Sequence, residues 1–169
     1  MDKLKEKFHQ KATVLAAEIK DIIKNNGDFK LGEITVAQVY QGMKGMTGMV
    51  TETSKLDPEE GIRFRGYSIP ELRKQLPKAP GGTEPLPEGI FYLMLVGELP
   101  SQDDVSFITN EWMKRSNVPK HVFDVLEKLP IDTHPMTQFI TGIMALQTES
   151  VFAKAYSQGI SKKEYWDYA

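Results

Sequence analysis

The chain has no cysteine among its 169 residues. Disulfides, catalytic thiolates and cysteine-based zinc sites are therefore excluded. Its 21 basic and 23 acidic residues give a formal net charge of -2, so bulk charge does not predict a nucleic-acid partner. No apolar run approaches the roughly 20 residues that cross a bilayer, and the longest is Ile90 to Val96. The sequence predicts a single globular domain with no membrane insertion.

Common catalytic and metal-binding patterns are also missing. The three histidines, His9, His121 and His134, are too far apart to form a ligand set, so we expect no metal site. There is no G-x-S-x-G, and the glycine-rich stretch lacks the Gly-Lys-Ser/Thr end of a P-loop. His134 precedes a proline at a predicted helix start, where it could act as a base or simply cap the helix.

Most of the chain has helical periodicity, with apolar residues recurring at three- and four-residue intervals. Caps, prolines and glycines bound the segments. The predicted helices cover 3–25, 35–41, 71–76, 90–96, 102–115, 119–128, 135–147 and 150–158. Ser101 is the expected N-cap of 102–115, and Asp132 or Thr133 that of 135–147. The side chains expected on the inner face of 135–147 are Met136, Phe139, Ile140, Ile143 and Met144.

The C-terminal residues predict one more helix. Ser161 and Glu164 have the spacing of a capping box, but the chain stops at Ala169. We therefore expect this sequence to be a fragment of a longer protein.

The stretch from Tyr40 to Ile69 is the one clear departure from helical periodicity. Three glycines fall three residues apart in GMKGMTG, a spacing that permits either phosphate contact or tight turns. The segments 49–55 and 62–67 alternate as strands do, and DPEEG between them predicts a hairpin turn. Arg63 and Arg65 are expected on one face of this hairpin, where they could bind an anion or, in the commoner arrangement, pair with carboxylates on neighbouring helices.

Five segments closely resemble the citrate synthase family, in its eukaryotic mitochondrial type. They are GEITVAQVYQGMKGMTGMVTETSKLDPEEGIRFRGYSIPE, LPKAPGGTEPLPEGIFYLMLVGELP, EWMKRSNVP, THPMTQ and ESVFAKAYSQGISKKEYW. The resemblance runs from Leu31 to the C-terminus without an obvious gap. It implies a mainly α-helical fold, with residues 1–169 forming the N-terminal portion of the multi-helical large domain and carrying one small β-hairpin.

The resemblance also implies a function. Family members are acyltransferases of the tricarboxylic acid cycle that work as homodimers, condensing acetyl-CoA with oxaloacetate and water to citrate and CoA. Acetyl-CoA is a substrate, and no cofactor is permanently bound. The implied location is the mitochondrial matrix, although the sequence contains no targeting segment.

Residue by residue, the resemblance carries two positions over. The family has a basic residue in the glycine-spaced loop and another in a G-I-x-basic segment, both binding CoA phosphates, the second across the dimer. They match Lys44 and Lys162. Animal members have arginine at both positions, and lysine keeps the charge but not the planar fork. The family's two catalytic histidines and its aspartate have no match here, so we expect this piece alone to be inactive.

The sequence leaves two alternatives open. One is a non-catalytic truncated paralogue that serves as an assembly, filament or dimerisation component. The other is 2-methylcitrate synthase, which uses propionyl-CoA, because the acyl pocket of the family lies outside this sequence.

Overall fold

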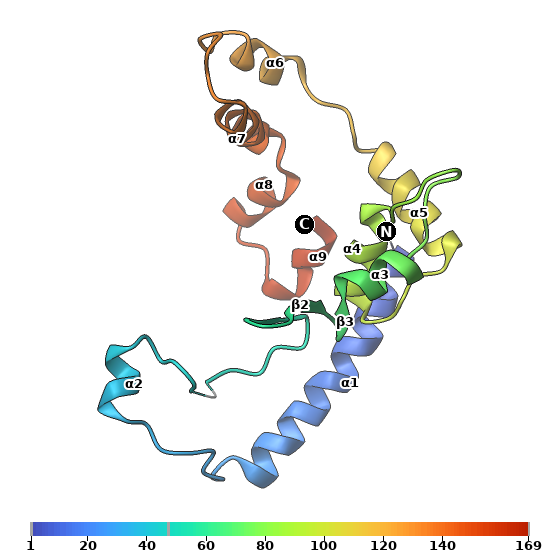
Figure 1. The fold of residues 1–169 in the computed structure, drawn as a ribbon. Coiled ribbons are helices and arrows are strands. Elements are labelled where there is room, and N and C mark those ends of the chain that lie inside the picture. The colour runs from blue at the N-terminus through green and yellow to red at the C-terminus, as the bar shows by residue number, and fades with distance from the viewer. Residues whose placement is uncertain (1, 47, 169) are drawn as a thin grey trace. The chain divides into compact units, whose positions relative to one another are not determined.

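The computed structural model describes residues 2–46 and 48–168. Nine α-helices, two short 3-10 helices and a three-stranded antiparallel sheet make up this described part of the chain (Figure 1). The predicted mainly helical fold with one small β element is confirmed. The chain divides into two compact units, with the boundary in the sequence between Glu111 and Trp112. Each unit is described by itself.

The first unit opens with its longest helix, α1 (Asp2–Asn26), which extends the predicted 3–25 by one residue at each end. Its N-terminal part contacts α4 (Pro87–Val96) and buries Leu4, which is 2% exposed. Beyond the docked turns, the apolar side chains Ile19, Ile22 and Ile23 are exposed, so the apolar stripe of α1 is covered mainly toward its N-terminal end.

Asp104 holds α1 to the rest of this unit. It lies in the first turn of α5 (Gln102–Met113), where the Ser101 hydroxyl donates to its Oδ2 at 2.7 Å and accepts from its backbone N–H at 3.2 Å. Lys3 Nζ lies 3.0 Å from its Oδ1, and Lys7 Nζ lies 3.7 Å from the same atom. Lys7 also donates to the Tyr92 hydroxyl. Ser101 is thus confirmed as the N-cap, and its partner Asp104 also pairs with lysines about a hundred residues away.

The short helix α2 (Val36–Tyr40) matches its prediction. Its N-cap, Thr35, accepts from the Gln38 backbone N–H at 3.2 Å, and the Gln38 side chain accepts from the Thr35 backbone N–H at 3.0 Å. This reciprocal capping box fixes where the helix starts.

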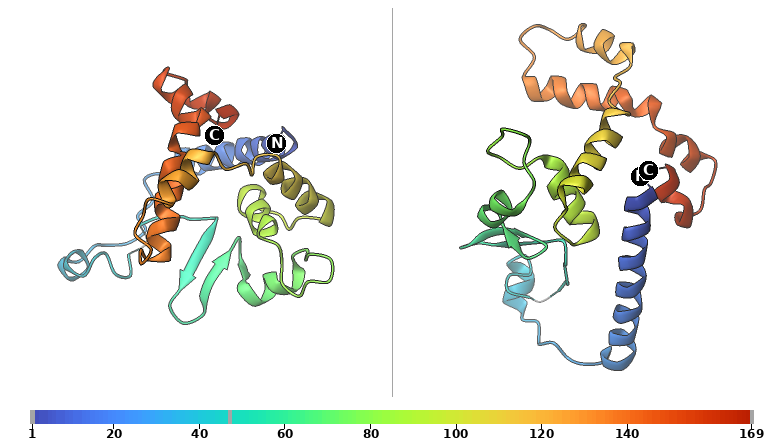
Figure 2. Two further views of the ribbon diagram at one scale, coloured as in Figure 1. Left: turned by 90° about the horizontal axis from the view of Figure 1, so that it is seen from above. Right: turned by 90° about the vertical axis from the view of Figure 1, so that its right-hand side faces the viewer.

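The sheet differs from the prediction in its bounds. Its strands are β1 (Ser54–Asp57), β2 (Gly61–Phe64) and β3 (Tyr67–Ser68) in that order, and Figure 2 shows the antiparallel pairing in its left view. The predicted strand 49–55 is wrong, because pairing begins only at Ser54, opposite Phe64. The predicted turn is confirmed: Asp57 Oδ1 accepts the Glu59 and Glu60 N–H groups at 2.9 Å, and Gly61 takes a φ of 95°.

The second predicted strand, 62–67, is wrong for a different reason. Phe64 pairs with Tyr67, and the two residues between them, Arg65 and Gly66, have φ of 49° and 88°. Two consecutive residues with positive φ characterise the type I′ turn that joins twisted antiparallel strands. The chain therefore reverses at Arg65, and one expected strand becomes two.

The core of the first unit lies between α3 (Ile69–Gln75), α4 and the sheet. Leu72, Leu76 and Leu93 are buried together. Ser68 caps α3 through a reciprocal hydrogen-bond pair with Glu71. The helix α4 begins at Pro87, three residues before the predicted start, because proline fits the first turn, where its missing N–H has no intrahelical partner.

The second unit contains α6 (Lys120–Leu126), α7 (Pro135–Ala145) and the 3-10 helix η1 (Leu146–Glu149). At Gly142 an added Cβ would lie 3.5 Å from Leu126 Cδ1, so α6 and α7 pack closely there. The N-cap of α7 is His134, whose Nδ1 accepts from the Met136 N–H at 3.1 Å. The predicted caps, Asp132 and Thr133, were wrong, and the capping interpretation of His134 is confirmed.

The expected inner face of α7 is also wrong. All five of its side chains are more than half exposed: Met136, Phe139, Ile140, Ile143 and Met144. The buried residue of α7 is instead Gly142, because α6 packs on that side of the helix.

The chain continues through α8 (Val151–Ser157), the 3-10 helix η2 (Lys162–Glu164) and α9 (Tyr165–Tyr168). Ser150 caps α8 by accepting the Ala153 N–H at 3.0 Å. The predicted capping box is confirmed, with the Ser161 hydroxyl donating to Glu164 Oε2 at 2.7 Å. In the described part of the chain, no helix is both long and apolar enough to span a membrane.

The Asp104 anchor predicts a pH-dependent stability. Burial acts to raise the pKa of Asp104, but hydrogen bonds from Ser101 and Lys3 outweigh it and lower that pKa from 3.8 to about 2. Because the folded pKa is the lower one, the stabilisation is fully present above pH 3.8 and is lost as the pH falls through about 2. We expect Asp104→Asn to lower the free energy of unfolding by about 2 kcal/mol at pH 7. Urea unfolding checks this.

The same measurement needs a matched control. Asp103 is the exposed neighbour in the same helical turn, so Asp103→Asn should cost less than about 0.5 kcal/mol. An Asp104→Asn loss that stays equally large at pH 2 would show that the carboxylate charge is not its cause.

Candidate functional site

The loop that carries Lys44 follows directly after α2 and has an unusual backbone. Gly42, Met43 and Gly45 have φ of 68°, 62° and 73°. An L side chain rarely adopts this left-handed region, and glycine enters it without a steric penalty. The first two glycines of the three-residue spacing are therefore required by the turn.

Two backbone hydrogen bonds close this loop. The Met43 N–H donates to the Gln38 carbonyl at 2.8 Å, and the Met46 N–H donates to the Met43 carbonyl at 3.1 Å. Gly48 differs from the other two glycines because it has no positive φ, and an added Cβ would meet only the Met43 side chain at 3.7 Å. The regular sequence spacing thus contains two structurally distinct kinds of glycine.

The loop presents groups suited to an anion. Lys44 is exposed, and no ion pair joins it to another residue of the ranges 2–46 and 48–168. Within those ranges the Lys44 and Gly45 amides also donate to no backbone carbonyl. An ammonium group beside unused amides is an arrangement that can hold a phosphate.

Lys162 lies in the second unit, at the start of η2. The chain leaves α8 through Gly159, which has a φ of 81°, and enters η2 at the Ser161 cap. The side chain of Lys162 is exposed and, in the part of the chain that is described, takes part in no ion pair. Its position is therefore fixed by a glycine turn and a capping box, as that of Lys44 is fixed by a glycine turn.

Aromatic packing holds the turn around Lys162. The Phe152 and Tyr165 rings meet edge to face with centroids 5.2 Å apart, and Tyr156 lies 6.0 Å from Phe152 and 6.3 Å from Tyr165. Because Tyr165 follows η2 and the other two rings lie on α8, this cluster joins the two sides of the turn. Edge-to-face pairs of this kind contribute about 0.5–1.5 kcal/mol beyond their buried area.

The two hairpin arginines have different partners. Arg63 pairs with Glu60, its Nε donating at 3.0 Å, and its Nη1 lies 3.6 Å from Glu71. Arg65 instead donates to backbone carbonyls, with Nη2 at 2.8 Å from the Met94 oxygen. Carboxylate pairing is confirmed for Arg63 and wrong for Arg65, because the turn directs Arg65 toward the end of α4.

The remaining candidates have structural roles or distant positions. His121 Nε2 lies 3.1 Å from the Ala145 carbonyl and joins α6 to the end of α7. His9 is exposed on α1. Over the described residues, no three His, Asp or Glu side chains form a group able to hold a metal ion.

Sequence reasoning missed one group of charged side chains. Arg73, Lys74 and Lys78 gather with Glu84 around a surface pocket beside α3. The available signal was the R-K-x-x-x-K spacing at the end of a helix. This spacing was insufficient because it does not show that the following loop brings Glu84 back to Arg73.

Comparison with known proteins identifies the class. The family described as "Citrate synthase, C-terminal domain" matches residues 42–169. The citrate synthase of Kajikia audax, named mitochondrial, is 54% identical over 150 residues, which are 89% of this chain and 32% of that relative. The mitochondrial citrate synthase of Saccharomyces cerevisiae is 52% identical over 165 residues, 98% of this chain and 34% of the relative.

A relative with a different name also matches. The mitochondrial 2-methylcitrate synthase of Yarrowia lipolytica is 48% identical over 167 residues, 99% of this chain and 36% of that relative. The chain belongs to the citrate synthase family. It spans about a third of the length of the curated relatives it matches. The phosphate-binding roles of Lys44 and Lys162 stay predictions, as does the assignment of 1–169 to the N-terminal part of the large domain.

The two kinds of glycine in the Lys44 loop predict different responses to substitution. Gly45→Ala places a side chain at a φ of 73°, which costs about 1–2 kcal/mol. We expect amide hydrogen exchange at Met43 and Met46 to become about fivefold faster or more. Gly48→Ala is the matched control and should leave these rates nearly unchanged, since its backbone is ordinary. Equal acceleration in both variants would contradict the assigned turn.

Proposed function

We propose that this chain is part of a citrate synthase, which joins acetyl-CoA to oxaloacetate and releases citrate and CoA. In that reaction a carbon–carbon bond forms between the acetyl methyl carbon and the oxaloacetate ketone carbon, and water then cleaves the thioester. The observation that carries the proposal is the identity of 52–54% to mitochondrial citrate synthases over most of the chain. The names of these relatives also support a mitochondrial location, which we propose to be the matrix.

The chain's own contribution is to bind substrate. Lys44 and Lys162 present ammonium groups from turns that are fixed by left-handed glycines and caps, and we assign both to the phosphates of CoA. The phosphates of CoA are anionic and accept charge-assisted hydrogen bonds. By holding the nucleotide end of acetyl-CoA, the two lysines position the thioester, because binding energy from remote groups orients the reacting centre. They take no part in making or breaking bonds.

The proposal includes a homodimer. The apolar face of α7 supports it, since side chains such as Phe139 and Ile140 are 62% and 57% exposed. An exposed apolar face of this kind is typical of a surface that a second chain or further chain length covers. The proposed citrate synthase supplies both, as two copies of a protein about three times this length.

A second candidate is 2-methylcitrate synthase. The 48% identity to the Yarrowia lipolytica enzyme favours it almost as strongly. The two reactions differ only in the acyl group, acetyl or propionyl.

Kinetics of the natural full-length protein separate these candidates. We expect kcat/KM for acetyl-CoA to exceed that for propionyl-CoA by at least about tenfold, because an extra methylene costs about 1–3 kcal/mol in a fitted pocket. The 169-residue chain alone is expected to release no CoA. The reverse preference would replace the proposal with 2-methylcitrate synthase. An intact native mass near 19.1 kDa together with no activity would favour a non-catalytic truncated protein.

The lysine roles have their own test in the full-length protein. Lys44→Ala and Lys162→Ala should each raise the KM for acetyl-CoA roughly tenfold, the loss of one charge-assisted contact, and leave the KM for oxaloacetate nearly unchanged. Lys163→Ala removes a neighbouring exposed charge and is the matched control for Lys162. An equal rise in both KM values would count against a role in holding CoA.

A further inference from the structure

The docking of α1 depends on an exposed lysine that serves a buried carboxylate. Lys3 Nζ lies 3.0 Å from Asp104 Oδ1, and the two side chains are 56% and 12% exposed. The charge on Asp104 is thus shielded from water, whereas the amine that balances it can be reached from solution. A reagent that changes the charge of Lys3 therefore also acts on the buried carboxylate.

The other groups around Asp104 do not replace Lys3. Lys7 Nζ is farther from the same oxygen, at 3.7 Å. It also donates to the Tyr92 hydroxyl and lies 5.1 Å from the centre of that ring. The hydrogen bond to Tyr92 raises the pKa of Lys7, so Lys7 holds its proton tightly and is a poor nucleophile. Ser101 binds the other carboxylate oxygen, Oδ2.

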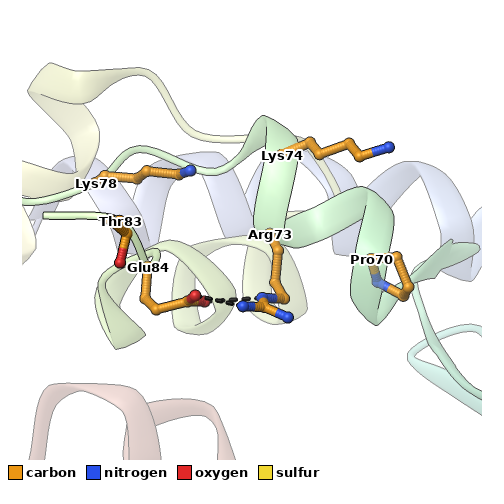
Figure 3. A pocket seen from close by; sticks show the side chains of 6 residues that line it. All are labelled: Pro70, Arg73, Lys74, Lys78, Thr83 and Glu84. Atoms are coloured by element: carbon orange, nitrogen blue, oxygen red, sulfur yellow. Dashed lines mark hydrogen bonds and ion pairs between the residues drawn. The ribbon is translucent and has the colours of Figure 1, made fainter.

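Acylation is the modification that removes the charge of a lysine, because the amine becomes a neutral amide. Acylated Lys3 would leave the more distant Lys7 as the cation beside Asp104. Removing one partner of a buried ion pair is strongly destabilising. An exposed pair such as Arg73 and Glu84, each more than half exposed, loses little when it is broken, because water replaces the partner (Figure 3).

The same helix contains a second lysine for comparison. Lys11 pairs with Glu98, and its side chain is 56% exposed, the same fraction as that of Lys3. Glu98, however, is 53% exposed, so water can solvate its carboxylate once the lysine charge is gone. A reagent in solution can reach both lysines, but only the modification of Lys3 would leave a buried charge poorly paired.

Apolar contacts add little to hold these turns in place. Of the described residues of α1, Leu4 is the buried one, and it lies next to Lys3 where the helix contacts α4. On α4, Tyr92 is buried as well. Undocking of the first turns of α1 would therefore expose Leu4 and Tyr92 and free the Lys7 ammonium. The charge on Lys3 is thus a large part of what keeps this contact closed.

We propose that Lys3 is an acylation site and that its modification releases the N-terminal turns of α1 from α4. The acyl donor is an acyl thioester, and this choice of donor rests on the proposed function, which has such a thioester as substrate. The uncharged Lys3 amine attacks the thioester carbonyl carbon. The C–N bond of an amide forms, the C–S bond breaks, and the thiol leaves with the proton that the nitrogen gives up.

Site-specific modification of the natural full-length protein tests the release. Lys3 or Lys11 is replaced by Nε-acetyl-lysine, and amide hydrogen exchange is followed over residues 2–12. Acetylation at Lys3 should accelerate exchange at least about tenfold, and acetylation at Lys11 less than about twofold. Equal acceleration by the two modifications, or none by that at Lys3, overturns the proposal.

A second variant tests the physical cause. In an Asp104→Asn background no buried charge remains, so acetylation at Lys3 should add less than about twofold. Lys3→Arg keeps the charge and should leave exchange nearly unchanged. A full tenfold effect of Lys3 acetylation in the Asp104→Asn background would overturn the assigned role of the carboxylate.

The reaction itself is tested with acetyl-CoA as the donor. The full-length protein is incubated with it, and peptide mass spectrometry follows each lysine. Lys3 should be acetylated within about threefold of the rate at Lys11, since the two are equally exposed. Acetylation of Lys11 without that of Lys3 overturns the proposal. Neither experiment measures citrate formation, so a protein without synthase activity would contradict the proposed function and leave these results unaffected.

Discussion

The first unit depends on the burial of one carboxylate. Asp104 is 8% exposed, and a buried charge is tolerated only when it is paired and hydrogen-bonded. Its two oxygens are served from two directions, by the Ser101 cap within its own helix and by Lys3 from α1. Asp104 therefore completes the cap of its own helix and also attaches α1, which is distant in sequence. Leu4, which follows Lys3 in the sequence, is buried and supplies the apolar part of the contact between α1 and the rest of the unit.

Sequence reasoning succeeded where the determining contacts are local. The caps at Ser101 and Ser161 and the turn at Asp57 each depend on residues within four positions, and the structure has all of them. The mainly helical class followed from the same kind of signal. Such features are readable because the side chain and the backbone group it bonds are specified together in the sequence.

Sequence reasoning failed where a more distant partner decides. The alternation from Ile62 to Tyr67 fits a single strand, but the Arg65–Gly66 turn reverses it, and Arg65 then bonds the Met94 carbonyl, 29 residues away. The five apolar residues of α7 have helical spacing and so were expected inside, but amphipathicity does not say which element covers a face. For the candidate site, Lys44 and Lys162 came from family resemblance, and the structure adds the conformations of their turns. The Arg73–Glu84 pair joins residues eleven apart, which no periodicity reports.

The Lys3–Asp104 contact also sets an order of events during synthesis. Its two residues are separated by 101 positions, so at 5–20 residues per second the ribosome needs roughly 5–20 s to pass from one to the other. Through that interval α1 lacks its buried carboxylate partner, and most of the stability of a helix in a protein comes from the packing of its apolar face. The helix α1 is thus synthesised first in this unit but is among the last of its elements to dock. A nascent-chain binding factor would meet the apolar stripe of α1 before the rest of the unit does.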